Sequence, residues 1–316
     1  MSITLFSHSD CELHDMGDMH PEAPERVGQI RDQLIASGLD MFVAYDQAPL
    51  ADIEQLKQTH TPAYINHLVE QDRWLALQVE QGAVNPSIQL DPDTLMMQHS
   101  FRAALRAAGA GIAAVDEVLD TANKRAFCAV RPPGHHAVKD GAMGFCILGN
   151  VAIAAHHALN NRGLKRVVIV DFDVHHGNGT ENIVEGDERI RLYSSYQGNF
   201  YPYPDKDAAK PNVIHTPLEA GAKGEQFREA VSGWFADIDA FAPELIIISA
   251  GFDAHVEDPL AQLRLRESDY NWITTELVKI ADRHAAGRIV SMLEGGYNLS
   301  ALGRSVVAHI KALVEN

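Results

Sequence analysis

The chain has 316 residues, of which 46% are hydrophobic and 22% are charged. This composition is typical of a globular protein with a large core, and it excludes a disordered, collagen-like or coiled-coil chain. The 43 acidic and 26 basic side chains leave a net charge of −17, which argues against nucleic acid or an anionic membrane surface as a partner.

Three cysteines are present, Cys11, Cys128 and Cys146, and none has a Cys-x-x-Cys spacing. This odd and sparse set argues against a disulfide framework or a thiolate metal site and favours a reducing compartment. The first residues lack the basic segment of a signal peptide, and no apolar run approaches the ~20 residues of a membrane span. We therefore expect a soluble, cytoplasmic protein whose cysteines pack in the core.

Two segments have clear helical periodicity. Residues 26–37 form an apolar stripe that ends at Gly38, and residues 101–119, rich in Ala and Gly, follow a candidate N-cap at Ser100. The pair Gly109-Ala-Gly111 resembles half of a dinucleotide-binding fingerprint. Because it lies inside the helical segment and follows no strand, we interpret these small residues as a surface for close helix packing.

Five short apolar runs predict β-strands, and several of them are continuously apolar, as in parallel sheets that are covered on both faces. They are residues 126–130, 166–170, 190–194, 244–249 and 288–293. Helical patterns alternate with them, and no linker or repeat interrupts the chain. The sequence therefore predicts an α/β protein with one domain over residues 1–316, built on a central, mostly parallel sheet with helices on both faces.

Four of these strands run directly into loops that are dense in His, Asp, Gly or Tyr. The loops are Arg131-Pro-Pro-Gly-His-His136, Asp171-Phe-Asp-Val-His-His-Gly-Asn-Gly-Thr180, Ala250-Gly-Phe-Asp-Ala-His255 and Glu294-Gly-Gly-Tyr-Asn298. The carboxyl ends of parallel strands lie at one edge of a sheet, so we expect all four loops to surround one crevice.

Three residues of these loops form a candidate set of metal ligands. Asp173 and His175 are one residue apart after a buried strand, and Asp253 follows another strand. Three protein ligands with an open position are typical of catalytic zinc, which polarises a carbonyl and lowers the pKa of water. Two carboxylates and one imidazole can also hold Fe(II) or Mn(II), so the residue types leave the metal open.

The tandem pair His135-His136 follows a stiff turn and is a candidate for proton transfer. Asp171 and Asn178, from the adjacent loop, are natural partners for the second nitrogen of each ring. An anionic partner favours imidazolium, whereas an amide leaves a neutral general base, so the pair would divide the two roles.

The phenol of Tyr297 follows two glycines at a strand end and could donate to a developing oxyanion above the metal position. Phe145, in Gly144-Phe-Cys146, is a candidate for the wall of a passage into the site, although such a residue can equally belong to the core.

With these motifs assembled, the chain closely resembles the histone deacetylase superfamily, in particular its class II and bacterial deacetylase-like amidohydrolase members. The resemblance runs nearly end to end. It covers the four loops above and also His20-Pro-Glu-Ala-Pro-Glu-Arg26, Asp91-Pro-Asp-Thr94, Gly144-Phe-Cys146, Ser249-Ala-Gly-Phe-Asp253 and Asp258-Pro-Leu260.

The resemblance implies the arginase/deacetylase fold and hydrolysis of an acyl amide, with Zn²⁺ on Asp173, His175 and Asp253. It assigns the general base to His136, pairs His135 with Asp171, and gives Tyr297 the task of polarising the scissile carbonyl. Asn178 resembles the class II variant of a position that is Asp in class I.

Further positions are implied by the resemblance alone. Gly144 and Phe145 resemble the substrate tunnel, and Arg26 matches a position associated with the acetate-release channel. Asp171, Asp173, His175 and Ser194 match a structural potassium site. Phe200-Tyr-Pro202 departs from the family's usual Phe-Phe-Pro, so the assignment of a tunnel wall to Tyr201 does not carry over directly.

The expected substrate is an acylated lysine peptide or a small acylated amine, with acetyl as the default acyl group, and a homo-oligomer stays open. Family members specialised for acetylated polyamines carry Glu where this chain has Leu260, which favours acyl-lysine. Two different readings remain: an arginase-like enzyme with two Mn²⁺ ions and a catalytically inactive acyl-lysine-binding module. Against the arginase-like enzyme, Gly177 and His255 stand where its second carboxylates would be. Against the inactive module, the metal ligands, the histidine pair and Tyr297 are all present.

Overall fold

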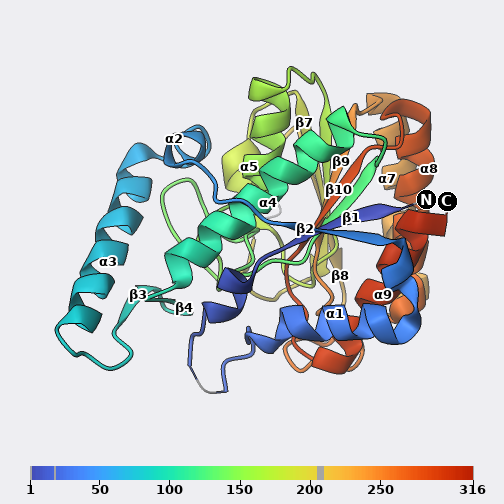
Figure 1. Cartoon of the computed structure of the whole chain (residues 1–316). Coiled ribbons are helices and arrows are strands. Elements are labelled where there is room, and N and C mark those ends of the chain that lie inside the picture. Colours follow the sequence, from blue (N-terminus) through green and yellow to red (C-terminus); the bar gives the residue numbers. More distant parts are fainter. Residues whose placement is uncertain (1, 18, 205–209, 316) are drawn as a thin grey trace.

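The structure, a computed structural model, describes residues 2–17, 19–204 and 210–315, so both ends of the predicted domain, residues 1 and 316, lie outside the described part. Its centre is a parallel eight-stranded sheet in the order β2-β1-β5-β10-β9-β6-β7-β8 (Figure 1). The strands are β1 (Ile3–Ser7), β2 (Val43–Gln47), β5 (Arg125–Cys128), β6 (Val167–Asp171), β7 (Ile190–Gln197), β8 (Val213–Leu218), β9 (Leu245–Ala250) and β10 (Ile289–Leu293).

Helices cover both faces of this sheet, as the sequence predicts. One face carries α1 (Glu25–Ser37), α7 (Gly224–Phe241), α8 (Glu267–His284) and α9 (Leu299–Glu315). The other face carries α4 (Ser100–Asp120), α5 (Asn150–His156) and α6 (Asn178–Val184). Three further short helices are η1 (Ser9–Leu13), η2 (Leu39–Phe42) and η3 (His157–Asn161).

A smaller layer extends from the outer side of α4. It consists of α2 (Ile53–Leu56), α3 (Pro62–Glu80) and the antiparallel pair β3 (Ser87–Asp91) and β4 (Thr94–Met97). Their apolar side chains form a third core with α4, and Figure 1 shows α3, β3 and β4 projecting to one side of the sheet.

Strand β6 shows why the predicted runs are apolar throughout. Val168 and Val170 pack into the core under α7 and α8, whereas Val167 and Ile169 pack into the core under α4 and α5. Successive strand residues point to opposite faces, so a strand between two helical layers must be apolar at every position. Burying each such side chain contributes about 1.5–3 kcal/mol relative to leaving it exposed.

The predicted helices are present, with one correction at a terminus. Helix α1 ends where predicted, because Gly38 adopts the left-handed conformation at φ 74° and its N–H bonds to the carbonyl of Ile35. Helix α4 begins at Ser100 itself, with His99 as N-cap, so the prediction of Ser100 as the cap is wrong. The Ser100 hydroxyl instead accepts from the Met97 N–H at 2.8 Å and bonds to the ring of His14.

The glycines of α4 serve helix packing. A Cβ at Gly109 would collide with the carbonyl oxygen of Pro49, and one at Gly111 would lie 2.8 Å from the end of the Met292 side chain. The backbone contact at Gly109 leaves no space for a side chain, and at Gly111 the end of the Met292 side chain would have to move. Both contacts support the packing interpretation.

The four strands whose loops carry the predicted site are neighbours, in the order β5-β10-β9-β6 at the centre of the sheet. Asp171 pairs in register with Ser249, and Leu293 pairs with Ala250, so these strands end at the same level. The four loops therefore begin side by side. All three cysteines are free and buried, and within the described residues no helix is long and apolar enough to cross a membrane.

Candidate active site

Asp173, His175 and Asp253 converge as the sequence predicts. His175 Nδ1 lies 3.0 Å from Asp173 Oδ1 and 3.1 Å from Asp253 Oδ2. All three side chains are buried, and one ligand atom from each lies within 4.8 Å of the others. The contact between Asp253 Oδ2 and the His175 ring lacks hydrogen-bond geometry, and this oxygen makes no hydrogen bond to the other described residues. A buried carboxylate oxygen that faces an imidazole without a hydrogen bond fits a metal ion as its partner.

Two glycines make room for these carboxylates. A Cβ at Gly251 would collide with the Asp173 carboxylate, and a Cβ at Gly295 would collide with that of Asp253. The backbone can approach the ligands this closely only without a side chain. The Gly295 N–H also donates to Asp173 Oδ2 at 2.8 Å, which fixes that ligand.

The electrostatics of the cluster call for a cation. Burial and the neighbouring Asp173 raise the pKa of Asp253 to about 7. Burial disfavours a charged imidazole at His175, but the two carboxylates outweigh this and raise its pKa to about 10. Two buried carboxylates thus compete for positive charge, which a divalent ion would supply.

The tandem histidines contact the predicted partners. His135 Nδ1 lies 3.0 Å from Asp171 Oδ2, His136 Nδ1 lies 2.7 Å from Asn178 Oδ1, and the two ring centroids are 4.0 Å apart. The buried carboxylate of Glu294 accepts from the N–H groups of Gly134 and His135 at 2.7 and 3.1 Å, so it positions the loop that carries the pair.

The two rings have opposite pKa shifts. Burial opposes protonation of His135, but the charges of Asp173 and Asp171 raise its pKa well above 6.5. At His136, burial together with repulsion from His135 and His175 lowers the pKa well below 6.5. His136 is therefore neutral at pH 7. Since Asn178 Oδ1 only accepts hydrogen bonds, the proton of His136 is on Nδ1 and the lone pair is on Nε2.

A cavity of about 230 Å³ opens onto this centre, and its lining includes several predicted residues. It is lined by Asp93, His136, Gly144, Phe145, His175, Tyr201, Leu260 and Tyr297. The rings of Phe145 and Tyr297 meet edge to face at 5.9 Å. Burial raises the pKa of the Tyr297 phenol well above 10, so its hydroxyl stays protonated and able to donate.

Arg26 lies beside the loop of Tyr297, and its predicted role in substrate binding stays a prediction. It is fully buried and is not among the residues that line the cavity. Its guanidinium lies 5.1 Å from the centroid of the Tyr297 ring and donates to the carbonyl oxygens of Gly296 and Glu294 at 2.7 and 2.5 Å. The structure thus gives Arg26 contacts that brace the loop of Tyr297.

Three contributors were not singled out from the sequence. Asp93 lines the cavity and Glu294 positions the histidine loop. Both belong to motifs that carry the family resemblance, Asp91-Pro-Asp-Thr94 and Glu294-Gly-Gly-Tyr-Asn298, but their residue types alone indicate no role. Glu22 is fully buried between Arg26 and Arg131, at 2.9 Å and 2.5 Å. Tyr201, for which the sequence allows no firm assignment, lies in the cavity lining, and its hydroxyl has no hydrogen-bond partner among the described residues.

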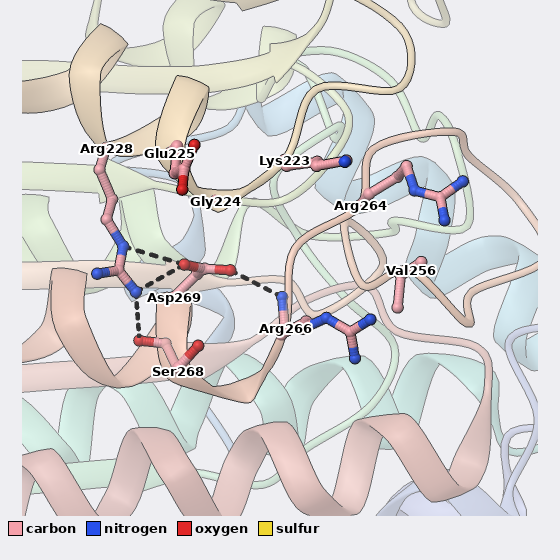
Figure 2. Close-up of a pocket in the computed structure, with 9 residues that line it drawn as sticks. All are labelled: Lys223, Gly224, Glu225, Arg228, Val256, Arg264, Arg266, Ser268 and Asp269. Atoms are coloured by element: carbon pink, nitrogen blue, oxygen red, sulfur yellow. Dashed lines mark hydrogen bonds and ion pairs between the residues drawn. The ribbon is translucent and has the colours of Figure 1, made fainter.

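A separate cavity of about 550 Å³ lies at the first residues of α7 and α8, and none of the predicted site residues lines it (Figure 2). It is lined by Lys223, Gly224, Glu225, Arg228, Val256, Arg264, Arg266, Ser268 and Asp269. Arg228 donates to Asp269 at 2.8 Å. The chemistry-bearing groups are therefore gathered at the smaller cavity.

The fold and the site together define a class: an α/β enzyme scaffold with a candidate metal centre beside a histidine pair. Comparison with known proteins identifies the family. The histone deacetylase domain matches residues 20–313, and the chain belongs to this family. The crystal structure of the HDA15 HD domain has a TM-score of 0.89 and 31% identity, covering 99% of this chain and 90% of that chain, which confirms the arginase/deacetylase fold.

Relatives include plant and bacterial proteins. The chain is 36% identical to the chloroplastic histone deacetylase 14 of Arabidopsis thaliana, over 94% of this chain and 73% of that protein. It is 33% identical to the histone deacetylase-like amidohydrolase of Pseudomonas aeruginosa, over 88% and 73%. It spans only 20% of Type-2 histone deacetylase 2 of Dictyostelium discoideum, with 33% identity over 98% of this chain. Family membership supports a deacetylase function.

Proposed function

We propose that this chain is a zinc-dependent amidohydrolase that removes an acyl group, acetyl by default, from an acylated amine such as acetyl-lysine. The observation that carries the proposal is the position of His136. Its ring lines the cavity together with His175 and Tyr297, and repulsion and burial keep it neutral. A base, a hydroxyl donor and one of the three candidate metal ligands in the lining of one cavity fit metal-assisted amide hydrolysis.

Asp173, His175 and Asp253 would hold the zinc, which would polarise the scissile carbonyl and lower the pKa of water when bound. The donor set itself also suits Fe(II), so the metal is part of the proposal. The four positions matching a potassium site, Asp171, Asp173, His175 and Ser194, stay a prediction.

The chain's own residues would move the protons. His136 Nε2, with its free lone pair, would accept a proton from the attacking water, which contributes about 10²–10⁴-fold. Tyr297 would donate its hydroxyl to the carbonyl oxygen as negative charge develops there. The Asp171 carboxylate holds the adjacent His135 as imidazolium, so the leaving amine would depart in a site that already carries a proton source.

The cavity wall favours an uncharged stem. Phe145, Tyr201 and Leu260 line it, and an apolar side chain cannot offset the desolvation of an ammonium group. The two carboxylates near Leu260 in sequence are engaged elsewhere: Glu257 pairs with Arg304 at 2.8 Å, and Asp258 accepts the Tyr297 N–H at 2.7 Å. An acyl-lysine side chain therefore fits this wall better than an acetylated polyamine.

The second candidate function, acetylpolyamine hydrolysis, is supported by Asp93. This exposed carboxylate belongs to the same cavity lining and could pair with a charged amine of the substrate. The discriminating measurement is kcat/KM for an acetyl-lysine peptide and for N8-acetylspermidine, with wild type, Leu260→Glu and Asp93→Asn. We expect wild type to prefer the peptide and Leu260→Glu to shift the preference toward the polyamine. A wild-type preference for acetylspermidine of about 10-fold, or 1.4 kcal/mol, would refute the argument from Leu260.

A two-manganese enzyme and an inactive binding module have less support. A two-manganese centre needs a second carboxylate at the position of Gly177, where even a Cβ would collide with Asp171. An inactive binding module has no need for a complete set of ligands, histidine pair and phenol. Hydrolysis of an acyl-lysine peptide by chelated protein, before and after addition of Zn²⁺ or Mn²⁺, separates both from the proposed zinc enzyme. Restoration by zinc alone supports the proposal, and no turnover with any metal contradicts it.

A further inference from the structure

A second group of metal-ligand residues lies outside the candidate active site. His176 follows β6, Glu181 lies on α6, and His215 lies on β8, so three separate elements contribute. Glu181 Oε2 lies 2.6 Å from His176 Nε2 and 3.2 Å from His215 Nε2. One ligand atom from each of the three residues lies within 4.8 Å of the others.

Both imidazoles are held from behind by hydroxyl groups. His176 Nδ1 lies 2.9 Å from Ser194 Oγ, and His215 Nδ1 lies 3.1 Å from Tyr196 Oη, so both Nε2 atoms face Glu181. Metal-ligating histidines usually carry such an outer hydrogen bond, which fixes the ring and the tautomer. A hydroxyl can donate or accept, so these partners suit the rings with the proton on either nitrogen.

We propose that His176, Glu181 and His215 form a second divalent-metal site, with zinc as the preferred ion. Two imidazole nitrogens and one carboxylate oxygen are a ligand set that zinc accepts, with room for a water at the fourth position. Zinc bonds of about 2.0–2.2 Å at tetrahedral angles place ligand atoms roughly 3.3 Å apart. The His215–Glu181 distance already matches, and the His176–Glu181 distance needs to widen by roughly 0.7 Å.

The Glu181 side chain is the ligand that would move to widen this distance. The Glu181 side chain is the most exposed of the three, at 16%, against 0% for His176 and 8% for His215. An ion can therefore reach the site past Glu181 while the two rings stay in place. His215 Nε2 is buried, and its contact with Glu181 Oε2 at 3.2 Å lacks hydrogen-bond geometry, so an ion between the two would give this nitrogen a well-directed partner.

The competing arrangement is a metal-free network in which both rings donate Nε2–H to one carboxylate. It gives His176 Nε2 a hydrogen bond to Glu181 Oε2 at 2.6 Å, whereas His215 Nε2 lies 3.2 Å from the same oxygen without hydrogen-bond geometry.

The expected role is structural. The site would join the loop after β6, helix α6 and the edge strand β8, and α6 also carries Asn178, which contacts the ring of His136. The ion would thus stabilise this side of the sheet without touching the substrate cavity, whose lining contains none of the three ligands.

Metal content tests the inference. The protein is chelated, reloaded with Zn²⁺ in the presence of a chromophoric chelator that removes weakly held ions, and measured by mass spectrometry. We expect about two tight zinc ions per wild-type chain, and about one in His215→Asn with peptide hydrolysis retained. Asp253→Asn should also hold about one zinc, and its thermal midpoint should rise with zinc, whereas Asp253→Asn/His215→Asn should show neither.

Equal zinc content in wild type and His215→Asn would overturn the second site and leave the proposed function intact. Equal content in wild type and Asp253→Asn would instead count against the active-site ligands. Glu181→Gln keeps the size of the side chain and removes its charge, so it serves if His215→Asn folds poorly. The exposed carboxylate variant Glu185→Gln, one turn further along the chain, is the matched control and should keep both ions.

Discussion

The buried ion cluster at Glu22 should contribute strongly to stability. Its carboxylate contacts Arg131 Nε at 2.5 Å and Arg26 Nη1 at 2.9 Å, and all three side chains are 0% exposed. Glu22→Gln keeps the shape of the side chain but leaves two buried guanidinium groups without a counter-charge. Breaking a buried ion pair in this way costs about 3–5 kcal/mol.

The cost converts into a measurable thermal shift. An unfolding entropy of about 2.1 cal/mol/K per residue gives roughly 0.66 kcal/mol/K for a chain of 316 residues. A loss of about 4 kcal/mol therefore lowers the midpoint by roughly 6 °C, measured by calorimetry at pH 7. Glu25→Gln, at the exposed start of α1, is the control and should change the free energy of unfolding by less than about 0.5 kcal/mol.

The pH dependence gives a second readout of the same pair of variants. Burial is outweighed by the two arginines, so the pKa of Glu22 is lowered to about 2. Its stabilisation is then fully present above the unfolded pKa near 4.5 and is lost as the pH falls through about 2. The difference between wild type and Glu22→Gln should stay constant from pH 5 to pH 8. A midpoint shift below about 1 °C would refute the reasoning.

Three further outcomes are expected. Asp253→Ala should lose the active-site zinc and turnover with the fold largely kept, and normal zinc and turnover would disprove the ligand assignment. Tyr297→Phe should lower kcat by about 10²–10³ with little change in substrate affinity, and unchanged kcat would return the phenol to a packing role. Burial lowers the pKa of His309 to about 3, so below pH 6.5 this histidine binds a proton in the unfolded chain but not in the folded chain. The free energy of unfolding of wild type should therefore fall by about 2 kcal/mol between pH 8 and pH 5 through this group. In His309→Gln, the free energy of unfolding, measured by urea titration, should fall by correspondingly less over the same pH range.

The strands that can be predicted from the sequence are those whose apolar runs match their buried place in the sheet. The strands that correspond to β5, β6, β7, β9 and β10 are recognisable in the sequence because helices cover both of their faces. Strands β1, β2 and β8 are absent from the sequence prediction. β2 is an edge strand whose residues 44–47 are exposed, and β8 contains His215 and Pro217. The pairing of β2 with β1 and of β8 with β7 makes these two segments strands, and no local apolar run records it. Residues 3–6 of β1, in contrast, are all buried.

The site residues can also be divided into those that the sequence predicts and those that it does not. The histidine pair, the metal ligands and Tyr297 follow central strands, so their convergence could be predicted from the rule that parallel strands end at one edge. The place of Arg26 could not be predicted from position alone, because its contacts to the carbonyl oxygens of Gly296 and Glu294 join segments far apart in the chain. Long-range contacts of this kind depend on packing, which a single sequence does not display.

The burial of the three ligands has a kinetic consequence. Asp173 and Asp253 are 1% and 0% exposed, and His175 is the ligand that lines the 230 Å³ cavity. Any ion held there would enter and leave by the passage that a substrate occupies. Substrate or inhibitor bound in the cavity should therefore slow the loss of metal to a chelator, in proportion to its occupancy.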